Sequence, residues 1–575
     1  MPQLNISSAE SSGTGGIPTL TGTMFVAGQT DAGPPPSGPG YVKCQSLQDV
    51  VNAFGPRSAV SAKLLDWLEG YFNIGGQAGK VAYVARVTDN TAAAAALTLN
   101  DGLPAPKPTV KVTALTAGTE GNQTFVAVTA GTGATFTAGA TATTVNLTAV
   151  SSYAGIGVGT PVSGTGVPAG TYIATVTPAS GTATLSQAFT GTTGTVTFTP
   201  GTVTVTVIPQ DSAGNALADE IHGPFYLTSQ LFADVTSTWV TFTQSAAGGF
   251  TVNLPAAVAA SALTGGADAS DITDTSYVAA LANFPTFLGS GGVALPGRTS
   301  IVCASGIQAH CNAMAATVGD STERVGLIAL ADSTTAAGAI SQIASLPAGN
   351  PIGDWTRCHI IQGSATLNAL AGGTARTVDG TAVVAALRAA VALGDNQAIA
   401  PAGKKWPVGY ISGFTTFFGV GGTFTQSDVN AMEAAGINCF ANYYGTLCLF
   451  GYVTPETQDL VFDQFSAACE RMAFSAELKP IMAGHEFDPI DTNTISQLDL
   501  QANTLAMAHY KAGSLFDGET GDASQAFSIL TGSPVNTPAT AQLRQLNVQA
   551  NLRITRYADS VNAQVTTFPV SVTLP

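Results

Sequence analysis

Charged residues are scarce in this sequence. Asp, Glu, Lys and Arg make up only 10% of its 575 residues, whereas about 25% is usual in soluble proteins. Lys and Arg together number 20 against 36 Asp and Glu, which gives a formal net charge of −16. Because nucleic-acid binding needs clustered cations to neutralise phosphates, this composition argues against that class of protein. So few surface charges also leave little electrostatic repulsion against self-association.

Paired cysteine motifs and long apolar runs are absent as well. The seven cysteines contain no CxxC motif and are odd in number, which predicts buried, reduced thiols rather than a disulfide framework. The longest apolar stretches, Ala256–Leu263 and Val383–Leu393, fall short of the roughly 18 residues that a membrane span needs. No secretory signal is visible at the start. We therefore expect a soluble protein made in a cytoplasm, with no membrane insertion.

One segment approximates a phosphate-binding loop. Gly292-Val-Ala-Leu-Pro-Gly297-Arg298-Thr299 has the glycine spacing of GxxxxGK[ST] but lacks the lysine. We expect the segment to lead into a strand at Ser300–Cys303, whereas a phosphate-binding loop follows a strand and opens a helix. The sequence therefore predicts no nucleotide site and no cofactor.

Two polar clusters contain metal-ligand residue types without the spacing of a metal site. Neither the HExxH pattern of zinc proteases nor the ligand order of an EF-hand occurs. The clusters are His485, Glu486, Asp488 and Asp491, interrupted by Pro489, and Asp268, Asp271 and Asp274. Loop and helix-start roles explain these residues, so we predict no metal ligands.

Catalytic motifs are also missing. The nearest match to a GxSxG elbow, Gly409–Gly413, has its serine one place late. His222, His310, His359 and His509 stand far apart in sequence. We predict no catalytic residue. The alternative is a hydrolase-type enzyme on the α/β part of the chain, and a convergent cluster of His, Asp and Cys in a deep pocket would favour it.

Hydrophobic periodicity predicts an α/β opening and a longer α/β part after residue 271. In the opening, strands at Thr23–Ala27 and Val81–Val87 enclose helices that start at Ser46 and Ser58. Strands that alternate with helices are typical of a mostly parallel sheet covered by helices. In the later part the predicted elements are the strands Ser300–Cys303, Val325–Leu330 and Cys358–Gln362 and the helices Ser276–Phe284, Gly306–Thr317, Thr334–Ser345 and Thr381–Leu393.

Between these parts the chain is β-rich, and from Gly121 through Gln210 it has no charged residue. Alternating Thr and Val with glycine turns predict a small all-β, sandwich-like module at about 131–200, inserted between Phe125–Val128 and Val203–Val207. Its role is either an exposed binding module or a neutral insert. The other predicted strands here are Val110–Val112, Val145–Leu147, Tyr172–Val176, Ala183–Leu185, Thr195–Phe198, Thr238–Phe242 and Phe250–Leu254.

The C-terminal part is predicted to be α+β and to end in a free strand. Its helices start at Ser427, at Thr454-Pro455-Glu456 and at Thr494, and Leu546–Ile554 alternates as a strand. The last strand has apolar Phe568, Val570, Val572 and Leu574 on one face and Pro569, Ser571 and Thr573 on the other. A terminal strand of this kind pairs with its own sheet or with that of another molecule.

We therefore predict a multi-domain protein of α/β and α+β class with an inserted all-β module. Residues 1–20, which are rich in Ser and Gly and include Leu4, Ile6 and Ile17, read as an extended arm. The predicted divisions are 1–20 (arm), 21–100 (α/β), 101–265 (β-rich, with the module), 266–420 (α/β), 421–562 (α+β) and 563–575 (terminal arm strand).

The order of several short motifs resembles the contractile tail sheath proteins of myophages and related injection machines. At the N-terminus these are Gly16-Ile-Pro-Thr-Leu-Thr-Gly22, Ser46-Leu-Gln-Asp49 with Phe54-Gly55, and Ala82-Tyr-Val-Ala-Arg-Val87. Later motifs are Leu263-Thr-Gly-Gly-Ala-Asp268, Gly436-Ile-Asn438 with the strand Leu447–Val453, and Leu546–Ile554 with the terminal strand. The resemblance covers about 1–100 and 260–575, so it implies nothing about the module at 131–200.

The resemblance implies a structural protein with a sheath core that forms stacked hexameric rings around a tail tube. Terminal arms of adjacent subunits would pair with a neighbour's C-terminal domain, and contraction would release energy stored at assembly. The implied partners are neighbouring sheath subunits, the tube protein, and baseplate and tail terminator proteins. The implied location is the virion tail, after assembly in the host cytoplasm. A surface- or glycan-binding protein that uses the 131–200 module is a further alternative.

Overall fold

The computed structural model describes most of the chain, but the two predicted arms lie outside the described residues. The structure therefore does not describe the predicted arm residues, which are Leu4, Ile6 and Ile17 at the N-terminus and Phe568, Val570, Val572 and Leu574 at the C-terminus. The described residues are 22–30, 40–55, 57, 60–76, 79–87, 92–103, 105–141, 143–146, 157–177, 179–192, 194–210, 216–246, 252–267, 272–316, 322–344, 355–368, 375–394, 396–456 and 462–558.

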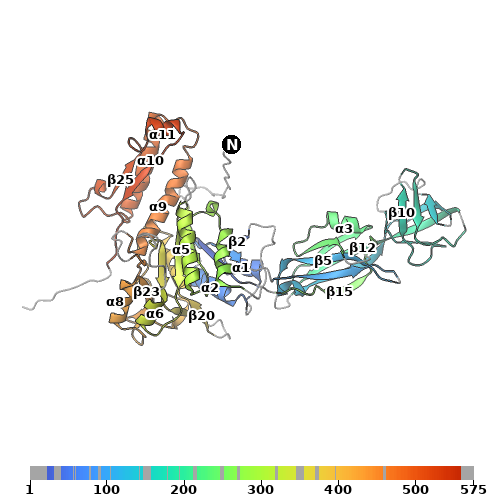
Figure 1. Ribbon diagram of the computed structural model, residues 1–575, viewed down its shortest axis with the longest axis horizontal. Coiled ribbons are helices and arrows are strands. Elements are labelled where there is room, and N and C mark those ends of the chain that lie inside the picture. Colours follow the sequence, from blue (N-terminus) through green and yellow to red (C-terminus); the bar gives the residue numbers. More distant parts are fainter. Residues whose placement is uncertain are drawn as a thin grey trace, which may run out of the picture.

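A nine-stranded, mostly parallel sheet forms the centre of the main body (Figure 1). Strands β1, β16, β17 and β18 are buried along their whole length, and strands covered on both faces are expected to be largely apolar. The strand order is β2 (Tyr41–Cys44), β3 (Ala82–Arg86), β1 (Met24–Gly28), β16 (Gly291–Ala294), β17 (Arg324–Ala329), β18 (Cys358–Ile361), β23 (Ile437–Tyr443) and β22 (Phe418–Gly419), with β24 (Thr446–Phe450) paired to β23. The chain segments 21–100, 266–420 and 421–562 thus share one sheet.

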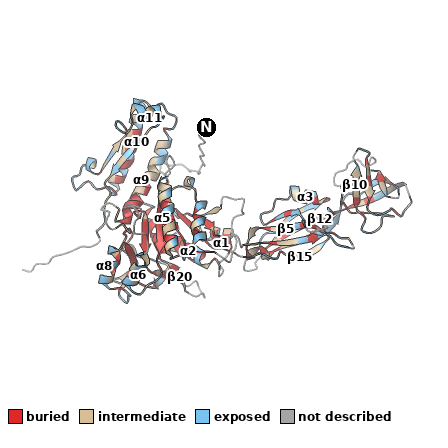
Figure 2. Cartoon of the chain, in the orientation of Figure 1, coloured by how far each residue is buried: buried red, intermediate tan, exposed pale blue. Residues whose placement is uncertain are grey.

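Helices cover both faces of this sheet, each face over its own apolar core. Side chains alternate along β1, so that Met24 and Val26 enter one core whereas Phe25 and Ala27 enter the other. Figure 2 shows buried residues concentrated along the sheet, between the helical layers. The first core lies against α1 (Leu47–Phe54), α2 (Ala62–Asn73), α7 (Thr381–Val391) and α9 (Phe465–Ala483), and the second against α4 (Asp274–Ala280), α5 (Ile301–Ala316), α6 (Ala336–Ile343) and α8 (Gln426–Ala434).

Buried ion pairs tie α2 to a small three-stranded sheet. Arg376 lies 2.9 Å from Asp66 and also pairs with Glu69, both on α2. Tyr410 donates a hydrogen bond to Glu69 at 2.8 Å. Removing one partner from such a buried pair typically costs about 3–5 kcal/mol, so this cluster fixes α2 against the small sheet. The three strands are β20 (Arg376–Asp379), β19 (Ser364–Leu367) and β21 (Ile411–Phe414).

The chain between β3 and α4 forms a β-rich body beside the main body (Figure 1). Two sheets share a core that includes Val112, Val126, Val205 and Phe242. One sheet contains β14 (Val240–Gln244), β5 (Pro108–Ala117) and β4 (Ala94–Asn100). The other contains part of β12 (Gly194–Pro209), β6 (Thr124–Thr132), β13 (Glu220–Phe225) and β15 (Val258–Ala262), and α3 (Thr228–Asp234) packs beside them.

Strand β12 continues from this body into a smaller group of strands at the far end of the molecule, labelled by β10 in Figure 1. Residues Gly201–Pro209 pair with β6, whereas Gly194–Phe198 pair with β7. The smaller group has its own apolar core, which includes Val145, Ile173 and Phe198. Its other strands are β7 (Phe136–Ala140), β8 (Thr144–Asn146), β9 (Val162–Ser163), β10 (Ile173–Thr177) and β11 (Thr182–Leu185). We call residues 133–200 the distal strands.

The prediction of a strand at Ser300–Cys303 is wrong. The strand lies earlier, at Gly291–Ala294, and α5 begins at Ile301. Ser300 instead acts like a helix cap, because its Oγ accepts a hydrogen bond from the Cys303 amide at 3.2 Å. The segment Gly292–Thr299 therefore does run from a strand into a helix, contrary to the sequence-based expectation.

Other predicted boundaries also differ from the structure. Residues 454–456 are not helical. The Thr454 Oγ donates to the Phe462 carbonyl, and α9 begins at Phe465. Helix α2 begins at Ala62 rather than after Ser58. Helix α5 begins five residues before the predicted Gly306, and the predicted helix Ser276–Phe284 is α4 followed by a short 3-10 turn. Among the strands, Thr195–Phe198 and Val203–Val207 are one strand, residues 252–254 form none, and Leu546–Ile554 shortens to β26 (Gln549–Leu552).

The distal strands can be tested as a separable unit. Gly133 donates its amide to the Pro200 carbonyl, so the next hydrogen-bonded pair of β6 and β12 is Gly131 with Thr202. Replacing residues 132–201 by Asn-Gly would close that pair with a tight hairpin turn. Because the distal core and the core of the β-rich body are separate clusters, the shortened protein is expected to fold. Its melting temperature, measured by calorimetry, should change by less than about 5 °C. Loss of cooperative unfolding would contradict this division.

Candidate assembly interface

A helical hairpin rises from the main body (Figure 1). The first half of α9 belongs to the body, because Phe465, Cys469 and Met472 enter the first core. Its second half packs with α10 (Thr492–Lys511), where Phe474 meets Leu505. One continuous helix therefore carries the hairpin away from the sheet.

A buried ionic triad fastens α10 to α9. His509 Nδ1 lies 2.6 Å from Glu470 Oε1, and Nε2 lies 3.1 Å from Glu477 Oε2. Burial lowers the pKa of His509, but the hydrogen bonds to Glu470 and Glu477 outweigh it and raise the pKa to about 9. Both ring nitrogens therefore donate at neutral pH, and the imidazolium bridges the two helices.

The triad predicts a pH-dependent stability. A histidine whose pKa rises from 6.5 to about 9 on folding stabilises the protein fully below pH 6.5, and the contribution disappears as pH rises through 9. In urea unfolding at pH 6, His509→Gln should be less stable than wild type by about 3 kcal/mol. At pH 9.5 the difference should shrink.

The control for this experiment is His222→Gln, because His222 pairs with Glu220 alone among the described residues, at 3.4 Å and away from the hairpin. Its difference from wild type should be small at both pH values. If the difference in unfolding free energy between wild type and His509→Gln stays constant from pH 6 to 9.5, the charged triad is contradicted.

A two-stranded sheet lies against the hairpin. Strand β25 (Phe527–Leu530) pairs antiparallel with β26. Its inner face, which includes Phe527, Ile529 and Leu552, packs on the helices, whereas Ser528 and Asn551 are exposed. Within the described residues no further strand pairs with either one. Such an edge presents unpaired N–H and C=O groups, which another strand can use.

The points at which the two arms begin are held on the main body. Gln464 lies one residue before α9 begins. The Tyr557 amide donates to its side-chain oxygen at 3.2 Å, and its side-chain nitrogen donates to the Tyr557 carbonyl at 3.1 Å. Tyr71 donates to the Gly22 carbonyl at 2.7 Å. Tyr71 belongs to the first core and Tyr557 packs against it. The predicted arm residues beyond these two points lie outside the described residues.

Solved structures show what this architecture is similar to. No protein-family model and no curated protein matches the sequence. The sheath tail protein Lin1278 from Listeria innocua matches with a TM-score of 0.52 at 13% identity, over 89% of this chain and 88% of that one. A sheath tail protein from Desulfitobacterium hafniense matches with a TM-score of 0.51 at 12% identity, over 92% of this chain and 93% of that one.

The chain has the fold of the sheath tail proteins. The resemblance predicted from the sequence is thereby confirmed at the level of fold. Strand β23, from the predicted C-terminal part, shares its sheet with β1, and the match covers about nine tenths of both chains.

Three histidines meet acids in the described part of the chain, namely His222 with Glu220, His485 with Asp488, and His509 with Glu470 and Glu477. His310 contacts Arg324, His485 lies between Asp488 and Gln501, and His359 is buried against aromatic rings. No group of three or more His, Cys, Asp or Glu there could hold a metal. Among the described helices, none has the length and apolarity to cross a bilayer.

All seven thiols are free and buried, as the sequence predicted. Burial raises the pKa of each one, for example that of Cys44 to about 12 and that of Cys448 to about 11. A thiol that stays protonated is a poor nucleophile, so these cysteines serve packing.

Proposed function

We propose that this protein is the sheath subunit of a contractile tail. The observation that carries the proposal is the shared fold with two sheath tail proteins over about nine tenths of each chain. In this proposal the subunits form stacked hexameric rings around a tube, and contraction of the sheath drives the tube through the host envelope. The protein is structural, acts in the virion tail and is assembled in the host cytoplasm.

The proposed contact between subunits is strand addition at the β25–β26 sheet. The terminal strand predicted at Phe568–Leu574 has one apolar face, and the inner face of β25 and β26 is also apolar. Main-chain hydrogen bonds would supply affinity, and the matching alternation would set the register. The N-terminal arm, with Leu4, Ile6 and Ile17, is proposed to join the same mesh. Further proposed partners are the tube protein at the inner surface and baseplate and tail terminator proteins at the ends.

Electron microscopy of the purified protein at high concentration tests the proposed assembly. We expect tubes or stacked rings that sediment together, because the subunit carries its own strand and a sheet edge to receive it. A uniform monomer at every concentration would contradict the proposal.

The terminal strand supplies a matched pair of variants for that assay. Val570→Asp with Val572→Asp places two charges on the apolar face, whereas Ser571→Asp with Thr573→Asp places the same two charges on the polar face. Burying an unpaired charge is costly, so the first variant should lose tube formation and the second should keep it. Both should unfold at the wild-type temperature, because the strand belongs to a neighbour.

Loss of the fold in the first variant would show that the strand pairs within its own subunit. Equal loss of assembly in both variants would show that added charge, rather than the buried face, is responsible.

A further inference from the structure

The strand order of the main sheet reverses at one point, between β1 and β16. After β1 the chain passes through α2 to reach β3 on one side, and after β16 it passes through α5 to reach β17 on the other side. Helix α2 lies over the first core and α5 over the second. The carboxyl ends of β1 and β16 therefore flank a topological switch point, where open α/β sheets form their ligand crevices.

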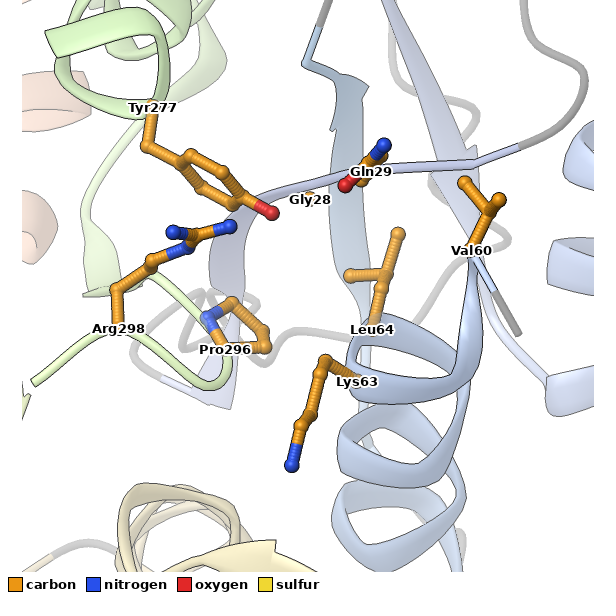
Figure 3. Close-up of a pocket in the computed structure, with 8 residues that line it drawn as sticks. All are labelled: Gly28, Gln29, Val60, Lys63, Leu64, Tyr277, Pro296 and Arg298. Carbon is orange, nitrogen blue, oxygen red and sulfur yellow. The ribbon is translucent and has the colours of Figure 1, made fainter. Parts of the chain in front are cut away.

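A cavity of about 360 Å³ occupies this position. That volume lies at the lower end of the range for small-molecule sites, about 300–1,000 Å³. Its lining comes from the end of β1, the start of α2, helix α4 and the loop after β16. Figure 3 shows Gly28, Gln29, Val60, Lys63, Leu64, Tyr277, Pro296 and Arg298 around it.

Arg298 is held in place at one wall of this cavity. Its guanidinium carbon stacks 3.9 Å from the centre of the Tyr277 ring, and its Nη1 donates to Asp274 at 3.3 Å. In Figure 3 the guanidinium and the Tyr277 hydroxyl both point toward the space beside Gln29. Arginine carries five N–H donors in a planar fork, and only one bond to a side chain is made here within the described residues. The fork is thus preorganised, with donors left for a ligand.

The loop after β16 shapes the rim. Gly297 has a φ of +70°, and a side chain there would meet the stem of Lys63 at about 3.1 Å. The Gly297 amide donates to Asp379 at 2.7 Å, which anchors the loop. Lys63 is exposed, and in Figure 3 its ammonium points away from Tyr277 and Gln29. The lining thus has two cationic side chains, Arg298 and Lys63, and two carboxylates, Asp274 and Asp379, are bonded to the loop that carries Arg298.

We propose that this crevice binds a small anion of the phosphate or carboxylate class. The Arg298 fork matches the two oxygens of such a group bidentately. Tyr277 and Gln29 add polar contacts, and Leu64 and Pro296 form an apolar wall for the rest of the ligand. The loop that supplies Arg298 runs from a strand into a helix without the lysine of a phosphate-binding loop, so the arginine takes the role of the cation.

Isothermal titration of the full chain with inorganic phosphate and with citrate, at constant ionic strength, tests this site and separates the two anion classes. We expect saturable binding of at least one anion, weakened at least tenfold in Arg298→Gln. The affinity of Arg298→Lys should lie between those of wild type and Arg298→Gln, because lysine keeps the charge but lacks the planar fork of donors. Tyr277→Phe, which removes only the hydroxyl, should weaken binding less while the fold is retained.

The matched control is Arg544→Gln, because Arg544 is an exposed arginine on the hairpin side of the molecule. It should bind as wild type does. Failure of both anions to bind saturably, or equal binding by Arg298→Gln and Arg544→Gln, would overturn the proposal. A third outcome is that neither anion binds but Arg298→Gln forms fewer tubes than wild type. That result would mean that the crevice holds an acidic side chain of a neighbouring subunit, and it would also overturn the proposal.

Discussion

The parallel pairing of β1 with β16 is the contact on which the main body depends. It joins Met24–Val26 to Gly292–Ala294, and the four side chains of Met24–Ala27 enter the two cores in alternation. The whole β-rich body lies in the loop that this pairing closes. The entropy of loop closure grows slowly, by about 0.6 kcal/mol for each doubling of length. A long insertion between β3 and α4 therefore costs the main sheet little, and the distal strands extend that insertion at a second such point, between Thr132 and Gly201.

Several of the few charges of this chain lie inside it. Arg324 is fully buried, where its guanidinium donates to the carbonyls of Phe284 and Pro285 at 2.7 Å. Glu470 and Arg388 are buried as well. Each buried charge is one fewer at the surface of a chain that has few charges, which lowers the repulsion between copies. For a subunit proposed to pack against identical, acidic neighbours, this distribution favours assembly through apolar faces and backbone edges.

Local sequence patterns predicted several strands and the clear helix caps. The alternation of Ala82–Val87 and the Ser46 capping box place β3 and α1 where the structure has them. Short apolar runs were harder, because Gly291–Ala294 and Ser300–Cys303 both fit a buried strand and only the Ser300 cap separates them. Of the two-stranded sheet on the hairpin, only β26 was predicted, from its alternating pattern. Its pairing with Phe527–Leu530 does not follow from the sequence. The crevice was missed, because it depends on residues as distant as Gly28 and Arg298 meeting at a switch point that only the strand order reveals.

The central claim is that the terminal strand of one subunit pairs with the β25–β26 sheet of another. If its apolar face packs inward, Ser571 lies on the same outer face as exposed Ser528. The most direct measurement mixes two differently tagged proteins, one carrying Ser571→Cys and the other Ser528→Cys or Asn551→Cys, under assembly conditions and mild oxidation. The account predicts a disulfide between the two tagged chains. A disulfide that forms only within a single chain carrying both cysteines would contradict it.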